Sequence, residues 1–60
     1  MTETEKRIIL DILHYGEYLT DIDIQAKNGD WYRIRNIAYE GKVWYLTMKN
    51  GIAQELKQIV

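Results

Sequence analysis

Residues 20–56 read TDIDIQAKNGDWYRIRNIAYEGKVWYLTMKNGIAQEL, and this stretch decides the fold. Three similar turn signals divide it: Lys27-Asn28-Gly29, Tyr39-Glu40-Gly41 and Lys49-Asn50-Gly51. The runs between the turns are rich in Ile, Tyr, Trp, Val and Thr, which are typical strand residues. The stretch therefore predicts a meander of antiparallel strands.

The first turn can be tested against the side chains that it brings together. An Asn-Gly turn forms either a two-residue hairpin or a three-residue loop that ends in a left-handed Gly. A two-residue turn would mix polar and apolar residues on both faces of the hairpin. The three-residue loop gives two apolar pairs and two opposite-charge pairs: Ile24–Tyr32, Ile22–Ile34, Asp23–Arg33 and Asp21–Arg35. Each such pair is worth about 0.2–1 kcal/mol, so the sequence predicts the three-residue loop.

The same loop type at the other two turns yields one continuous apolar face. It pairs Ile34 with Leu46 across the second turn and Met48 with Ile52 across the third. Because three local choices then agree, we expect this face to be the inner one. The expected inner face comprises Ile22, Ile24, Tyr32, Ile34, Trp44, Leu46, Met48, Ile52 and Leu56.

A helix is expected before the meander. Thr2 and Glu5 match a capping box, and one broad side of the helical wheel carries Ile8, Ile9, Ile12, Leu13, Tyr15 and Leu19. Gly16 is expected to end the helix in a left-handed conformation, which gives a helix over Glu3–Tyr15 and a connection over residues 17–19. The predicted fold is α+β, with the N-terminal helix packed on one face of an antiparallel β-meander (αββββ).

Residues 52–60 leave a second fold open. Ala53, Gln54 and Glu55 are good helix formers, so a short C-terminal helix would give the alternative αβββα. That alternative resembles a double-stranded-RNA-binding domain, but Asn50-Gly51-Ile52-Ala53-Gln54-Glu55 lies where that family has a basic cluster. No residue role is carried over, and the strand interpretation is preferred.

The bulk properties restrict the function classes. Sixty residues correspond to a single small α+β domain over residues 1–60, whose core is thin enough to favour oligomers. The chain has no Cys, no signal-peptide pattern and no apolar run long enough to cross a membrane, which favours the cytoplasm. A net charge of −1 argues against non-specific binding to nucleic acid or to an anionic membrane.

Few residues could carry chemistry. His14 is the only histidine, and Asp11 and Tyr18 are within helical reach of it, but a solvent-facing helix residue is the simpler interpretation. Asp21 and Asp23 share a strand face, where Arg35 and Arg33 would neutralise them. We therefore expect no catalytic residue, no metal or cofactor site and no evident small-molecule ligand, and we expect that the protein is not an enzyme.

The outer sheet face is the predicted interaction surface. Its candidates are aromatic, Arg and β-branched residues, types that are enriched at protein interfaces or that stack on bases: Trp31, Arg33, Arg35, Ile37, Val43 and Tyr45. The predicted function is a small cytosolic protein-interaction module that forms a homodimer or binds another protein. The alternative is a nucleic-acid-binding module that uses the same outer face.

Overall fold

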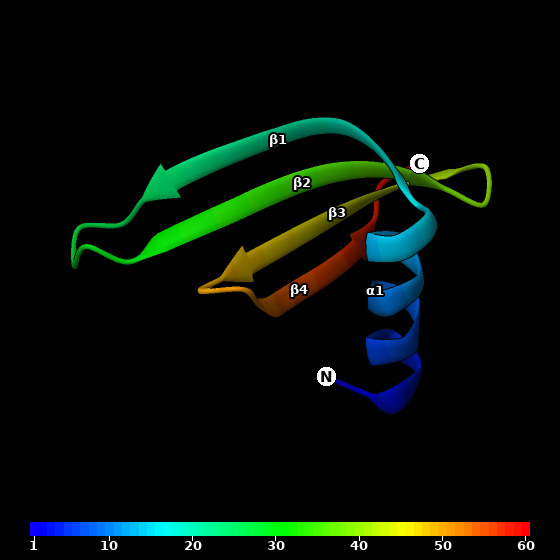
Figure 1. The fold of residues 1–60 in the computed structure, drawn as a ribbon, viewed down its shortest axis with the longest axis horizontal. Coiled ribbons are helices and arrows are strands. Elements are labelled where there is room, and N and C mark those ends of the chain that lie inside the picture. Colours follow the sequence, from blue (N-terminus) through cyan, green and yellow to red (C-terminus); the bar gives the residue numbers. More distant parts are fainter.

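The computed structural model describes residues 1–60 as one helix followed by a four-stranded sheet. The elements are α1 (Glu3–Tyr15), β1 (Glu17–Gln25), β2 (Trp31–Tyr39), β3 (Lys42–Lys49) and β4 (Ile52–Gln58). The strands lie in the order β1-β2-β3-β4, and every neighbouring pair is antiparallel (Figure 1). The predicted αββββ fold is confirmed, and the C-terminal segment forms a strand rather than the helix of the alternative.

Helix α1 begins as its sequence predicts. Thr2 is extended, and its Oγ1 accepts a hydrogen bond of 3.1 Å from the backbone N–H of Glu5. Ile9 and Ile12 face the sheet and are buried, whereas Tyr15 is 80% exposed, so its predicted place on the core side is wrong. The helix is neither long nor apolar enough to cross a membrane.

Gly16 joins α1 to β1, and its role differs from the prediction. Its φ of −74° and ψ of 148° are extended, so the expected left-handed helix end is wrong. A Cβ at this position would lie 2.4 Å from the backbone oxygen of Ile12 and 2.5 Å from Cγ2 of Ile37. Glycine is therefore required because the helix end and β2 approach closely here, and β1 begins directly at Glu17.

The first hairpin has the predicted register. Strand β1 pairs with β2 through the four expected pairs Ile24–Tyr32, Ile22–Ile34, Asp23–Arg33 and Asp21–Arg35. The loop closes with a hydrogen bond of 2.8 Å from the N–H of Ala26 to the oxygen of Asp30, and Gly29 has a φ of +90°. This is the three-residue loop ending in a left-handed Gly that the sequence predicts from its cross-strand pairs.

The other two turns are one residue shorter than predicted. Tyr39 pairs with Lys42, and Lys49 pairs with Ile52, which leaves two-residue turns at Glu40-Gly41 and Asn50-Gly51. All four turn residues have φ between 51° and 77°, as primed hairpin turns require. Ile34 consequently pairs with Thr47 rather than Leu46, and a β-bulge interrupts the β3–β4 register between Thr47 and Met48.

This one-residue difference divides the predicted inner face. We call the face that carries α1 the helix-side face and the opposite one the open face. Four of the predicted inner residues do lie on the helix-side face: Trp44, Leu46, Met48 and Leu56. The other five lie on the open face, because a slip of one residue reverses every side chain: Ile22, Ile24, Tyr32, Ile34 and Ile52.

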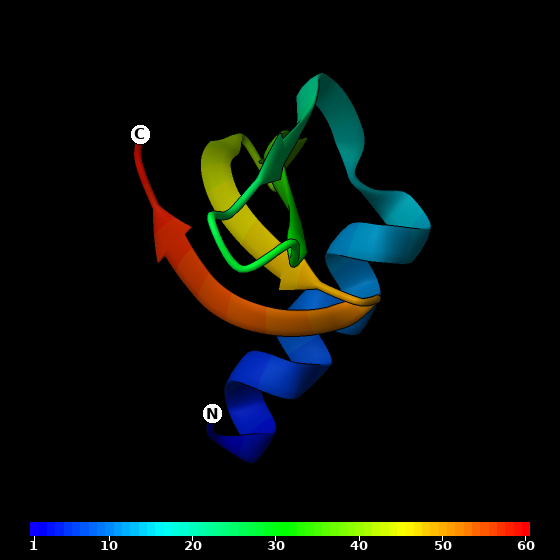
Figure 2. The same ribbon diagram turned by 90° about the vertical axis from the view of Figure 1, so that its left-hand side faces the viewer.

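The core is small and lies at one end of the sheet. Only four of 60 residues are buried, namely Ile9, Ile12, Ile37 and Leu46. Helix α1 crosses the strands near the start of β1 and the end of β2, and the β1–β2 hairpin extends well beyond it (Figure 1). In the view turned by 90°, β4 curves strongly and passes across α1 (Figure 2).

Candidate interaction surfaces

The structure separates the six predicted interaction residues onto two faces. Strand β2 places Trp31, Arg33, Arg35 and Ile37 on the helix-side face, while β3 places Val43 and Tyr45 on the open face. Ile37 is fully buried beneath α1 and cannot contact a partner. The expectation of one continuous surface is therefore wrong, because the β2–β3 turn has two residues rather than three.

On the helix-side face, four charged residues form what we call the Asp–Arg ladder: Asp21, Asp23, Arg33 and Arg35. Arg33 binds Asp23 through two parallel hydrogen bonds, Nε to Oδ1 at 2.8 Å and Nη2 to Oδ2 at 3.1 Å. These bonds lower the pKa of Asp23 below its usual 3.8 and raise the pKa of Arg33. The bidentate pair thus keeps both side chains charged and fixes the first hairpin.

The other half of the ladder is looser. The nearest cationic atoms to Oδ1 of Asp21 are Nε of Arg35 at 3.4 Å and Nε of Arg33 at 3.7 Å, and neither forms a hydrogen bond. Arg35 is instead held by the Tyr18 hydroxyl, to which its Nη1 donates at 3.0 Å, and by the Tyr18 ring at 4.8 Å. The Asp21 carboxylate therefore keeps free acceptor capacity.

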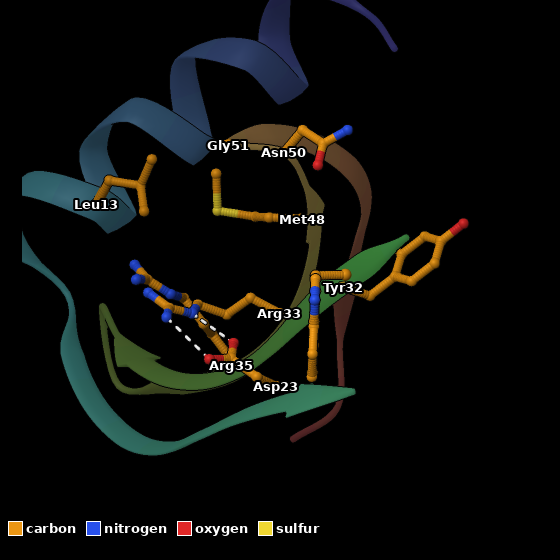
Figure 3. A pocket seen from close by; sticks show the side chains of 9 residues that line it. Leu13, Asp23, Tyr32, Arg33, Arg35, Met48, Asn50 and Gly51 are labelled. Carbon is orange, nitrogen blue, oxygen red and sulfur yellow. Dashed lines mark hydrogen bonds and ion pairs between the residues drawn. The ribbon is translucent and has the colours of Figure 1, made fainter. Parts of the chain in front are cut away.

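A cleft of about 460 Å³ opens between the ladder and the end of α1. Arg33 and Arg35 point into it from β2, Leu13 borders it from the helix and Met48 from β3, while Tyr32 points away (Figure 3). Of the two aspartates only Asp23 lines the cleft, but Asp21 lies 3.4 Å from Nε of Arg35, so the ladder as a whole has no net charge to attract an anion. The lining of the cleft mixes polar and apolar residues.

The open face of the first hairpin carries four apolar residues, which we call the arm patch: Ile22, Ile24, Tyr32 and Ile34. They form two adjacent cross-strand pairs in the half of the hairpin that is nearer the β1–β2 turn. Ile22 is 54% exposed and Ile24 is 47% exposed. Nothing within the chain covers this patch, so about half of the surface of Ile22 and of Ile24 remains in water, whereas Tyr32 and Ile34 are partly buried.

The rest of the open face is more polar. Lys49 lies beside the arm patch, 2.8 Å from the carboxylate of Asp30 and 5.6 Å from the centre of the Tyr32 ring. The hydrogen bond from Lys49 lowers the pKa of Asp30, and Asp30 raises the pKa of Lys49. Farther along, Tyr45 and residues of the β4 end line a shallow hollow of about 390 Å³.

The groups that could have served catalysis are engaged elsewhere. Nδ1 of His14 lies 2.8 Å from the backbone oxygen of Leu10 on the exposed side of the helix. Asp11 accepts a hydrogen bond of 3.1 Å from the Tyr39 hydroxyl. Partial burial, together with Asp11, raises the pKa of Tyr39 to about 12. No group of three or more His, Cys, Asp or Glu residues is placed to hold a metal ion.

No protein-family model, curated protein or solved structure matches this chain.

The arm patch is the surface that the sequence interpretation missed, because its residues were assigned to the core. The sequence shows that each face of β2 carries an isoleucine, but no local signal tells which face the helix covers. Ile34 and Ile37 are three residues apart on β2, and side chains that alternate along a strand cannot share a face at an odd spacing. Only one of these two isoleucines could face the helix.

Proposed function

We propose that this chain is a small cytosolic, non-enzymatic interaction module that pairs with a second copy through the arm patch. The observation that carries the proposal is the uncovered apolar patch in a chain whose core contains only four buried residues. Contiguous exposed apolar surface of this kind commonly marks a contact site. Pairing with a second copy would remove from water the apolar surface that the small core of each copy leaves exposed.

The exposed area of the chain supports a partner. The chain exposes 4430 Å², whereas a compact monomer of its mass exposes about 4100 Å². A standard interface takes about 800 Å² from each partner. Four strands about 4.8 Å apart and about eight residues long give the open face an area of the same order as this, about 800 Å², once the relief of the side chains is included. A contact that extends from the arm patch over much of the open face would therefore have the area of a standard interface.

The chemistry of the patch favours a second copy as the partner. Its four residues are uncharged, and the nearest cation, Lys49, is already paired with Asp30. A copy can thus cover the patch without placing like charges together, and closed two-fold pairing is the commonest symmetry for such contacts. Nucleic-acid binding has weaker support, because Arg33 and Arg35 are engaged by Asp23 and Tyr18.

Sedimentation of matched lysine variants tests the proposal. We expect the native chain to dimerise with a dissociation constant on the order of tens of micromolar, and Ile22→Lys to be monomeric because it places a charge in the apolar contact. Leu10→Lys is the control: Leu10 is 57% exposed on α1, close to the 54% of Ile22, and should leave the dimer intact. Tyr45→Glu, which changes a flank of the patch, should weaken the dimer less than Ile22→Lys.

Two results would contradict this function. A native chain that remains monomeric at about 1 mM would exclude self-association of useful strength. A dimer that survives Ile22→Lys but is lost in Leu10→Lys would place the contact on the helix instead.

A further inference from the structure

The two edges of the sheet are protected to different degrees. At the β4 edge, α1 packs against the strand and a β-bulge interrupts its pairing. At the β1 edge, all nine residues of Glu17–Gln25 are exposed. Beyond a bulge at Leu19, β1 runs regularly from Thr20 to Gln25 along β2. The outer side of these six residues presents unpaired backbone N–H and C=O groups, which is the template for adding another strand.

A second copy is a poor occupant of this edge. Two β1 strands related by a two-fold axis pair antiparallel, with residues of the same face opposite each other. Centring the axis on Asp21 or Asp23 sets that aspartate opposite itself, and centring it on Ile22 sets Asp21 opposite Asp23 twice. Each of these registers brings like charges together, which is unfavourable across a sheet. A register centred on Ile24 avoids this by setting Asp23 opposite Gln25, but it overlaps only the last residues of each strand, so the aspartates disfavour pairing between copies along the length of the edge.

The same aspartates favour a strand with the opposite charge pattern. Asp23 already binds Arg33 with both oxygens, but Asp21 accepts no hydrogen bond and is 37% exposed. A Lys or Arg on an added strand can donate to Asp21 without displacing an existing bond. On the open face, an apolar residue of that strand would lie beside Ile22 or Ile24 and extend the arm patch.

We propose that the outer edge of β1, residues 20–25, binds an extended segment of another protein as a fifth antiparallel strand. The segment carries Lys or Arg at alternate positions facing Asp21 and Asp23, with apolar residues between them. Backbone hydrogen bonds supply the affinity, and alternate side chains supply the specificity. The segment would lie in the plane of the sheet beside β1, and the second copy would lie over the open face, so the two would occupy adjacent surfaces without excluding each other.

Two blocked synthetic peptides, (Lys-Val)4 and (Glu-Val)4, test this proposal. The protein is used at about 1 µM, well below the expected dissociation constant of the dimer. Hydrogen exchange measured by mass spectrometry then shows directly whether the backbone amides of β1 become protected. We expect (Lys-Val)4, added up to about 1 mM, to slow exchange in residues 17–25, and (Glu-Val)4 to bind at least about tenfold more weakly.

Charge variants locate the contact. Asp21→Asn keeps the shape of the side chain and should weaken (Lys-Val)4 binding by about two- to fivefold, the range for a single exposed ion pair. Glu40→Gln removes the same charge at the β2–β3 turn, away from this edge, and should change nothing.

Three results would overturn the proposal, whatever the outcome for the dimer. The first is equal affinity for the two peptides, or no binding of either. The second is slower exchange in β4 rather than β1. The third is protection of β1 in the absence of peptide that rises with protein concentration in Ile22→Lys as much as in the native chain, because a second copy would then occupy the edge and not the arm patch.

Discussion

The end of the sheet beneath α1 and the β1–β2 arm beyond it place their apolar side chains on opposite faces. Beneath the helix, Ile37 and Leu46 point toward Ile9 and Ile12, and all four are buried. In the arm, the same face carries the Asp–Arg ladder, and the apolar residues point the other way. One sheet therefore has a closed core at one end and an uncovered apolar patch at the other. The apolar residues of one strand can thus lie on one face at one end and on the other face at the other end.

The change of face occurs within β2. Ile34 belongs to the open face and Ile37 to the helix-side face, with Arg35 and Asn36 between them. Arg35 can lie next to the core because Asp21 and Tyr18 accompany it there. Substitutions at three places test this difference between the two ends, and the largest effect is expected in the closed core.

Truncating the closed core should cost more than truncating the arm patch. Leu46→Ala removes a fully buried side chain and should lower the free energy of unfolding by about 2–5 kcal/mol. That is a large part of the roughly 3–9 kcal/mol expected for 60 residues. Ile34→Ala, which changes a half-buried residue of the open face, should cost only about 1 kcal/mol in the monomer.

Urea unfolding of dilute protein would compare the two variants. A larger loss for Ile34→Ala than for Leu46→Ala would mean that the open face is the true core.

Gly16→Ala should destabilise the junction between the helix and the sheet. The extended backbone at Gly16 suits alanine, which alone would favour the variant by about 0.4–1 kcal/mol. The new Cβ, however, would meet Ile12 and Ile37 at 2.4 and 2.5 Å, and such overpacking costs about 1–3 kcal/mol. We therefore expect a net loss in thermal and urea unfolding.

Gly29→Asn is the control for this junction. Gly29 has a φ of +90° with nothing near its missing Cβ, and asparagine tolerates positive φ better than other residues do. Gly29→Asn should cost less than Gly16→Ala, and the reverse order would show that the helix does not press on β2.

Acid should weaken the arm by protonating the ladder. Hydrogen bonds from Arg33 hold the pKa of Asp23 below 3.8, so its stabilising contribution is complete above that pH and is lost as pH falls through the lowered pKa. Asp23→Asn should therefore be less stable than the native chain near neutral pH, with a difference that vanishes in strong acid. The effect should be small, because both side chains are substantially exposed.

Unfolding free energies measured from about pH 7 down to about pH 2 would test this prediction. A difference between the native chain and Asp23→Asn that does not change with pH would show that the ion pair does not stabilise the folded state.

Much of the local structure could be predicted because short-range chemistry specifies it. Thr2 and Glu5 define the start of α1, and the charge pairs of Asp23 with Arg33 and Asp21 with Arg35 define the first hairpin. The second and third turns were wrong by one residue because Asn-Gly and Glu-Gly suit both turn lengths. The candidate surface inherited that error, so Val43 and Tyr45 were correctly placed on the open face, while Trp31, Arg33, Arg35 and Ile37 were not.

The sequence by itself determined the elements, their order and the antiparallel pairing of β1 with β2, since these depend on caps, turn residues and neighbouring side chains. Only the tertiary structure decided which face receives the helix. Both faces of β2 carry apolar residues, so alternation alone cannot choose between them. The choice follows from the close approach at Gly16, which brings α1 directly over Ile37 and leaves Ile22 and Ile34 on the open face.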